Sequence, residues 1–255
     1  MKIWIGYDPR EDIAAEVCRW SIEQYWPDAP VSFLALDHPK VSKVYSRKWS
    51  KEKGLMVDDL DGRPFSTEFA FSRFLVPYLC DYEGWALFVD CDMLFQTDPR
   101  DILEYADDQY ACVVVQHHHI PKETHKMDGC VQQIYRRKNW SSVMLWNCGH
   151  KDNARLGPDL VNTRTGSFLH QFAWLHDHRI GALPEQWNWL CGVSPTTVEG
   201  AYGIKTDAPK ILHYTEGGPW FPGFENCEYS DQWNKALEGY KIGRDTSERM
   251  ATGST

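Results

Sequence analysis

Two carboxylates, Asp90 and Asp92, stand one residue apart directly after the apolar run 85–89. The run predicts a buried strand, so the carboxylates follow the point where that strand ends. In an open α/β sheet, ligands bind outside the carboxyl ends of the strands. Carboxylate oxygens suit Mg²⁺ or Mn²⁺, which often shares its coordination sphere with substrate phosphates. The pair therefore predicts a metal–diphosphate site; a strand that ends in a solvated acidic turn is the alternative interpretation.

A third candidate ligand, His213, ends the apolar segment 210–213 and precedes a turn that contains Gly217 and Gly218. An imidazole at a strand end could complete a cation site begun by two distant carboxylates. The two glycines would let backbone N–H groups approach a phosphate. A hairpin turn with a hydrogen-bonded histidine fits the same residues.

Strand and helix patterns alternate through the first half of the chain, and these elements must position the candidate ligands. Asp8, Pro9 and Glu11 are the residue types that begin a helix, and apolar residues continue its face over 14–22. This alternation predicts parallel strands joined by right-handed crossovers. We expect strands at residues 3–6, 31–36, 85–89, 110–115, 143–146 and 210–213.

Other segments predict further helices and one long loop. Apolar residues at helical spacing over 71–79 indicate a helix that begins at Ser66 and is kinked by Pro77. Shorter helices are expected after Asp98 and over 166–176. The polar stretch 37–64 predicts a loop.

Composition limits the class of protein. The 255 residues allow one large α/β domain or two small ones, and the hydrophobic content of 42 % is enough for a sizeable core. A net charge of −9 argues against a nucleic-acid partner. Eight cysteines without a Cys-x-x-Cys pair argue against a zinc knuckle and favour a reduced, cytoplasmic protein. No apolar run reaches the roughly 18 residues of a transmembrane helix, and residues 1–6 are expected to lead directly into a strand, without the h-region of a signal peptide.

Five features in a fixed order resemble a GT-A fold glycosyltransferase, and the closest likeness is to glycosyltransferase family 8, the group of glycogenin and the lipopolysaccharide galactosyltransferases. The likeness runs from about Ile3 to about Trp220. The features are Asp90-x-Asp92 after an apolar strand, Ser72-Arg73-Phe74 upstream, Ser142-Val143-Met144-Leu145, Leu183-Pro184-Glu185-Gln186-Trp187-Asn188, and His213 followed by Gly-Gly-Pro-Trp220.

The resemblance implies a fold and an activity. The fold would be a single α/β GT-A domain over residues 1–245, with a mixed, mostly parallel central sheet flanked by helices, and a flexible tail over 246–255. The activity would be that of a metal-dependent hexosyltransferase using Mn²⁺ or Mg²⁺. It would move a hexose-like unit from a UDP-linked or other nucleotide diphosphate sugar to a glycan or lipid-linked acceptor in polysaccharide assembly, with retention.

The resemblance also implies roles for particular residues. Asp90, Asp92 and His213 would hold the metal. Arg73 would lie near the donor's diphosphate and sugar, and Gln171 would match a residue that touches the donor sugar. The remaining donor contacts would come from the loop after the first strand, from the Asp-x-Asp backbone and from the late turn: Tyr7, Asp8, Cys91, Gly217, Gly218 and Trp220.

Several positions depart from the family pattern. The family usually has a lysine before its Pro-Trp; here Gly218 stands there, and the interval from His213 is one residue shorter. Phosphate charge would then be met by the metal, Arg73 and backbone amides. The family's Asn-x-Gly appears as residues 140–142, its Asp-Gln pair as His170-Gln171, and another donor-side aspartate lines up near Gln116. All of these changes touch sugar recognition, so the donor sugar stays open.

Three further questions stay open at this stage. A retaining enzyme lets the leaving phosphate take the acceptor's proton, whereas an inverting one needs a base such as Glu185, Glu216 or Asp177. The rival functions are a sugar nucleotidyltransferase, against which the single glycine and single arginine of residues 6–10 argue, and a non-catalytic carbohydrate-binding protein. Two polar clusters also have alternative interpretations. The histidines at 117, 118, 119 and 125 could be a zinc-binding tract or part of a polar loop. The basic run Arg136-Arg137-Lys138 could contact an acceptor phosphate or be a solvated turn.

Overall fold

The computed structural model describes residues 1–117, 137, 139–194 and 208–252. In this part of the chain, six strands form a central sheet in the order β10-β8-β9-β6-β1-β2. Three of the neighbouring pairs are parallel, and β9 runs antiparallel to both β6 and β8. The mixed, mostly parallel sheet is therefore confirmed. Its strands are β1 (Lys2–Gly6), β2 (Val31–Leu34), β6 (Trp85–Val89), β8 (Cys112–Val115), β9 (Val143–Asn147) and β10 (Ile180–Leu183).

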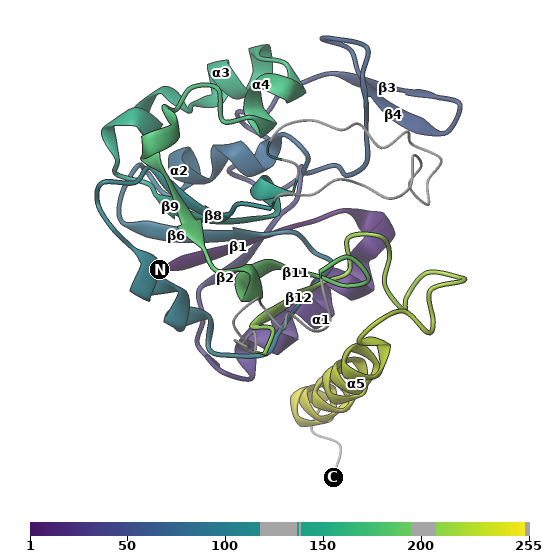
Figure 1. Cartoon of the computed structure of the whole chain (residues 1–255). Helices are drawn as coiled ribbons and strands as arrows, with labels where there is room; N and C mark the ends of the chain where they lie inside the picture. Colours follow the sequence, from purple (N-terminus) through teal and green to yellow (C-terminus); the bar gives the residue numbers. More distant parts are fainter. Residues whose placement is uncertain (118–136, 138, 195–207, 253–255) are drawn as a thin grey trace.

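The inner strands are apolar on both faces because helices or smaller sheets cover each side. Four of the five residues of β6 and every residue of β8 and β9 are buried. Near-continuous apolar runs of this kind are expected for strands covered on both sides. Figure 1 shows α2 (Val76–Leu79), α3 (Pro158–Thr163) and α4 (Gly166–His170) on one face, and α1 (Asp12–Glu23) on the other.

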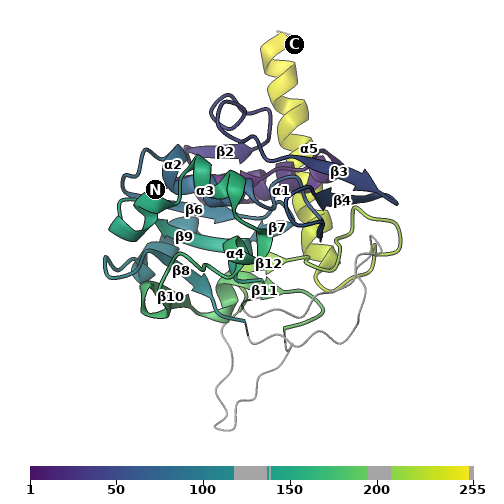
Figure 2. The same cartoon turned by 90° about the horizontal axis from the view of Figure 1, so that it is seen from above.

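A second, three-stranded sheet lies beside the central one; His213 ends one of its strands, and Asp90 and Asp92 directly precede another. It has the order β11-β12-β7, formed by β11 (Trp189–Leu190), β12 (Ile211–His213) and β7 (Met93–Phe95). β7 follows β6 after only the three residues 90–92, so this sheet continues from the end of a central strand (Figure 2).

A third sheet corrects the prediction of a loop over residues 37–64. β3 (Trp49–Glu52), β4 (Leu55–Asp58) and β5 (Pro64–Phe65) form an antiparallel sheet, with Lys53 and Gly54 in the turn between the first two strands. Both turn residues have positive φ, as a two-residue hairpin turn of type I′ requires. The pattern was missed because β3 exposes Ser50, Lys51 and Glu52, so it lacks an apolar face that could be read from the sequence.

The prediction that a helix begins at Ser66 is also wrong. The ordered turns begin with a 3₁₀ helix at Ser72–Leu75, and α2 follows directly. Ser66 does not cap a helix; its carbonyl accepts a hydrogen bond from the Arg10 guanidinium. Pro77 does not kink a helix because it lies in the first turn of α2, where its missing N–H has no intrahelical partner to lose. The helix predicted over residues 166–176 is shorter in the structure: α4 ends at His170, and turns follow it.

The other short helices match their predicted starts. Asp8 caps the 3₁₀ turn Pro9–Glu11 by accepting a hydrogen bond from the backbone N–H of Arg10, and α1 follows. Asp98 caps the 3₁₀ helix Pro99–Tyr105 in the same way.

The longest helix, α5 (Ser230–Thr252), was not predicted, although Trp233, Ala236, Leu237 and Tyr240 have helical spacing. It packs on α1 through buried Trp233 and Ala236 and, further along, through Gly239 and Gly243 against Trp20; its last turns extend away from the body (Figures 1 and 2). The helix continues past residue 245, where we expected the domain to end; residues 253–255 lie outside the described part. No described helix has the length and apolar character needed to cross a membrane.

Candidate metal centre

The turn between β6 and β7 places Asp90 and Asp92 at the carboxyl end of a central strand. The backbone N–H of Asp90 donates to the carbonyl of Ser142 at 3.0 Å, which fixes the turn to the start of β9. Cys91 between them is buried, and burial raises the pKa of its thiol well above the usual value. The predicted position of the two carboxylates at a strand end is confirmed.

The β7–β12 pairing delivers His213 to the same place. These strands are antiparallel, and His213 pairs with Met93, the residue after Asp92. One step further, the backbone N–H of Tyr214 donates to the carbonyl of Asp92 at 2.9 Å. Backbone register therefore holds two residues that are far apart in the sequence within reach of one another.

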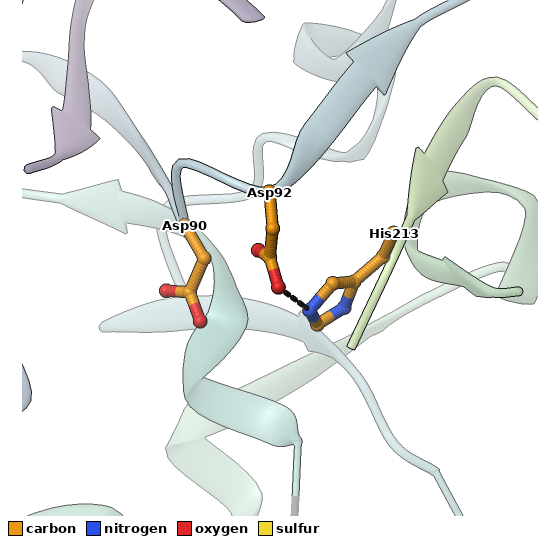
Figure 3. Close-up of side chains that lie close together, drawn as sticks. All are labelled: Asp90, Asp92 and His213. Atoms are coloured by element: carbon orange, nitrogen blue, oxygen red, sulfur yellow. Dashed lines mark ion pairs between the residues drawn. The ribbon is translucent and has the colours of Figure 1, made fainter. Parts of the chain in front are cut away.

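The three side chains lie close together, and Figure 3 shows the Asp92 carboxylate pointing at the His213 ring with Asp90 beside them. Asp90, Asp92 and His213 each offer a ligand atom, and these atoms all lie within 4.8 Å of one another. His213 Nε2 is 3.4 Å from Asp92 Oδ2. Ligands about 2.1 Å from an octahedral cation lie roughly 3 Å apart when adjacent and roughly 4.2 Å apart when opposite. Two carboxylates and an imidazole this close together are a donor set that could hold a divalent cation.

Arg73 lies against this cluster. Its Nη1 is 2.7 Å from Asp90 Oδ1 and donates to the carbonyl of Ser141 at 2.9 Å. The guanidinium also lies over the rings of Phe69 and Phe88, about 5 Å from each centroid. A carboxylate has two oxygens and can contact a guanidinium and a cation together. Arg73 is thus held at the candidate centre by contacts on several sides.

The loop after β1 holds Tyr7 and Asp8, which the resemblance places on the donor's base. The Asp8 carboxylate is fully buried and accepts hydrogen bonds from the side chain and backbone N–H of Arg10 and from the N–H of Glu68. Burial raises the pKa of Asp8, but these hydrogen bonds outweigh it and lower the pKa overall. The Tyr7 ring packs on Phe33 at 5.5 Å, and its hydroxyl donates to Asp12.

Glu11 adds a carboxylate near the cluster that the sequence analysis treated only as part of a helix start. Burial, followed by the negative charges of Asp92 and Asp8, raises the pKa of Glu11 to about 8. A proton on Glu11 therefore relieves repulsion among carboxylates that a cation would also relieve.

The turn after β12 explains one departure from the family pattern. A Cβ on Gly218 would overlap the six-membered ring of Trp220. Trp220 is half-buried and packs against Tyr214 and Trp233 with ring centroids 5.8 and 5.1 Å away. A lysine therefore does not fit at position 218 while Trp220 holds this place. Gly217 has φ of +129°, a conformation that favours glycine.

The residues expected near the donor sugar are linked to Arg73 through one turn. Ser141, whose carbonyl accepts from Arg73, also has its hydroxyl 2.8 Å from His170 Nδ1. Gln171 follows, and its side-chain amide donates to Ser167. Gln116 lies at the end of β8 with its amide near the carbonyls of Ile180 and Gly181.

The other polar clusters give no second ligand group in the described residues. Of the histidine tract, His117 is described and its carbonyl accepts from Trp140; His118, His119 and His125 lie outside the described residues, as do Arg136 and Lys138. Arg137 pairs with Asp177 at 2.6 Å. Glu185 accepts a hydrogen bond from Ser194, and Glu216 is exposed.

Sequence reasoning missed Asn188 and the hydroxyl of Ser142 as site residues. Asn188 Oδ1 lies 2.8 Å from His213 Nδ1, and Asn188 Nδ2 donates to Ser142 Oγ at 2.9 Å. Both residues lie in segments that carry the family resemblance, which was the available signal. Nothing in their local sequence distinguishes a hydrogen-bond support from an ordinary turn residue.

Comparison with solved structures identifies the fold. A galactosyltransferase, LgtC, solved with donor and acceptor sugar analogs, superposes with a TM-score of 0.55 at 14 % identity, over 94 % of this chain and 96 % of that chain. The glycosyltransferase GlyE of Streptococcus pneumoniae TIGR4 gives 0.55 at 15 % identity, over 99 % of this chain and 63 % of that chain. The bifunctional glycosyltransferase WbbM gives 0.58 at 15 % identity; it covers 93 % of this chain, which spans 49 % of WbbM. The predicted GT-A fold is confirmed.

Comparison of sequences gives a closer relative. No model of a known protein family matches the chain. Protein CDI of Arabidopsis thaliana is 46 % identical over 239 residues, which are 94 % of this chain and 86 % of that protein. At this identity and coverage, the chain belongs to the family of Protein CDI, and its fold is that of the GT-A glycosyltransferases of the family 8 type.

Proposed function

We propose that this protein is a metal-dependent glycosyltransferase that moves a hexose-like unit from a UDP-linked sugar to a glycan or lipid-linked acceptor, with retention. The observation that carries the proposal is the convergence of Asp90, Asp92 and His213 at the carboxyl end of β6 in a GT-A fold. Acidic and imidazole ligands at the point where this fold binds its ligands suit a cation that contacts a diphosphate.

The chemistry of the transfer explains why these residues would matter. When the sugar–phosphate bond breaks, negative charge develops on the leaving diphosphate, and a divalent cation held at this centre would stabilise it. Asp90 and Asp92 would supply the ligand charge that holds the cation, and His213 would add an imidazole ligand from β12, the strand that pairs with β7. Arg73 adds a fixed positive charge beside Asp90.

Because the family's lysine is missing, fewer positively charged groups are available to face the phosphates. Trp220 excludes a side chain at position 218, so the positive charge that the family places there is absent. The cation and Arg73 then carry more of the interaction with the phosphates. The backbone N–H of Gly217 already donates to the carbonyl of Tyr214 at 2.8 Å, so it adds no further donor for the phosphates.

The proposal of retention requires no base among the three candidate carboxylates. Glu185 is engaged by the hydroxyl of Ser194, and Asp177 pairs with Arg137, while Glu216 lies exposed after β12. In a retaining transfer the leaving phosphate oxygen takes the acceptor's proton, so a dedicated carboxylate is not required.

The test is release of free UDP from a panel of UDP-sugars, with Mn²⁺ and with chelator. We expect UDP release that requires the metal, and in Asp92→Ala a loss of at least about 100-fold, the order found when one charge-stabilising group is removed. Asp107→Ala is the matched control, because Asp107 is an exposed carboxylate in the turn before β8. Its activity should equal that of the wild type.

The rival functions give different products in the same assay. A nucleotidyltransferase would form pyrophosphate from a nucleoside triphosphate and a sugar phosphate. A carbohydrate-binding protein would leave every UDP-sugar intact. Near-normal UDP release by a folded Asp92→Ala variant would contradict the proposed role of the metal centre.

A further inference from the structure

Asn188 is a buried polar residue beside the candidate metal centre with no role in the proposed chemistry so far. It is fully buried, at the end of the 3₁₀ turn Glu185–Asn188, directly before β11. β11 runs parallel to β12 and pairs Leu190 with His213, which brings Asn188 alongside the imidazole. A buried amide is retained in an apolar environment only when its hydrogen bonds are made, so its partners define what it does.

The partners of Asn188 fix which way its amide points. Its Nδ2 lies 3.2 Å from the carbonyl of Asn139, which can only accept a hydrogen bond, so the nitrogen must be on that side. The same nitrogen lies 2.9 Å from Ser142 Oγ, whose own proton goes to the Asn139 carbonyl at 2.8 Å. The side-chain oxygen of Asn188 therefore faces His213.

This orientation assigns the protons of the imidazole. Asn188 Oδ1 is an acceptor 2.8 Å from His213 Nδ1, so Nδ1 carries a proton and donates it. In the neutral imidazole the other nitrogen, Nε2, then has its lone pair exposed, and Nε2 is the atom that points at Asp92. A histidine binds a metal through such a lone pair.

We propose that Asn188 is the positioning residue of the metal centre: it holds His213 in the tautomer and ring orientation that make Nε2 a metal ligand. The inference rests on the cation site of the proposed function. Residues that orient a metal-binding histidine through its second nitrogen change metal affinity by about 10- to 100-fold when they are removed.

The same hydrogen bonds also link His213 to the segment that carries Asp90. The hydroxyl of Ser142 holds Asn188, while the carbonyl of Ser142 accepts from the backbone N–H of Asp90. The turn over residues 139–142 thus contacts His213 through Asn188 and Asp90 through the backbone. The separation of the acidic and imidazole ligands is fixed through one short segment.

The first measurement needs no variant and no metal. ¹⁵N NMR of chelator-treated protein labelled at histidine shows which ring nitrogen carries the proton, with the His213 signal assigned by its loss in His213→Gln. We expect the neutral imidazole of His213 to be protonated at Nδ1. A neutral imidazole protonated at Nε2 would overturn the inference, whatever the variants show.

The second measurement is the affinity of the folded protein for Mn²⁺ alone, by calorimetric titration. We expect Asn188→Leu to weaken Mn²⁺ binding by about 10- to 100-fold. Asn188→Asp should keep His213 protonated at Nδ1, because a carboxylate oxygen accepts the same hydrogen bond. Unchanged Mn²⁺ affinity in folded Asn188→Leu, or an altered tautomer in folded Asn188→Asp, would contradict the inference.

Asn153 is the matched control for a merely structural effect. It is also a fully buried asparagine whose amide donates to two backbone carbonyls, those of Ala111 and Asn147. Asn147 is the end of β9 that pairs with Trp85, away from Asp90. Asn153→Leu should destabilise the fold but leave Mn²⁺ affinity unchanged. A wild type that binds no Mn²⁺ would instead sink the proposed function, while the tautomer measurement would still test the hydrogen bond to His213.

Discussion

Gly218 gives a prediction whose size follows from the contacts of a single ring. A methyl group at this position would overlap three atoms of the Trp220 ring, and Trp220 packs against Tyr214 and Trp233. Gly218 does not have a positive φ, so the backbone can accept alanine and the cost is steric. Overpacking of this kind costs about 1–3 kcal/mol. We expect Gly218→Ala to lower the free energy of unfolding by that amount.

A double-mutant cycle with Trp220→Ala separates this overlap from any other effect. Without the ring, Gly218→Ala should cost less than about 0.5 kcal/mol, so the coupling between the two changes should be about 1–3 kcal/mol. Urea unfolding followed by far-ultraviolet circular dichroism measures all four proteins without relying on tryptophan emission.

Gly149→Ala is the control, because Gly149 is exposed and its added methyl would meet one atom, the carbonyl oxygen of Tyr82, at 3.3 Å. The carbonyl would have to move by only a few tenths of an ångström, so Gly149→Ala should cost less than Gly218→Ala. Equal costs of Gly218→Ala with and without the Trp220 ring would refute the steric account of why no lysine occupies position 218.

Three further predictions concern stability. Arg47→Met should lower the free energy of unfolding, measured by urea unfolding, by about 3–5 kcal/mol, because it leaves Asp58 buried without its ion-pair partner. Adding Asp58→Asn to the same chain removes the unpaired charge and should recover part of the lost stability. Glu11 has a folded-state pKa of about 8 against an ordinary 4.5, so its contribution to stability falls as the pH rises between those values. Glu11→Gln should therefore raise the melting temperature, measured in the presence of chelator, at about pH 8.5 but not at about pH 4.5. The same rise at both pH values would contradict the raised pKa of Glu11. Trp233→Ala should cost about 3–5 kcal/mol in the same urea assay, and a loss below about 1 kcal/mol would show that α5 is not anchored there.

The site was predictable where a residue's neighbours in the sequence are also its neighbours in space. Asp90 and Asp92 are adjacent and follow an apolar strand, so their position at the sheet edge follows from strand periodicity. His213 also ends an apolar strand, but its approach to Asp92 depends on the β7–β12 register, which no local pattern shows. Its role as third ligand came from the order of motifs in the resemblance.

Elements without a clear apolar pattern were the ones missed. β3 has three exposed residues in succession, and its pairing with β4 depends on the positive φ angles of Lys53 and Gly54. Apolar residues recur at helical spacing in α5, but they cover only its first turns, and much of the helix is exposed. Asn188 could not be found in this way, because hydrogen bonding to His213 needs both strands to be placed first.

The most direct test of the metal centre is the anomalous scattering of crystals grown with Mn²⁺ and UDP. The account predicts one strong anomalous peak bonded to a carboxylate oxygen of Asp90, a carboxylate oxygen of Asp92 and Nε2 of His213, with the diphosphate on its open side. A peak bonded elsewhere, a bond to Nδ1 of His213, or UDP bound with no peak at these three residues would contradict it.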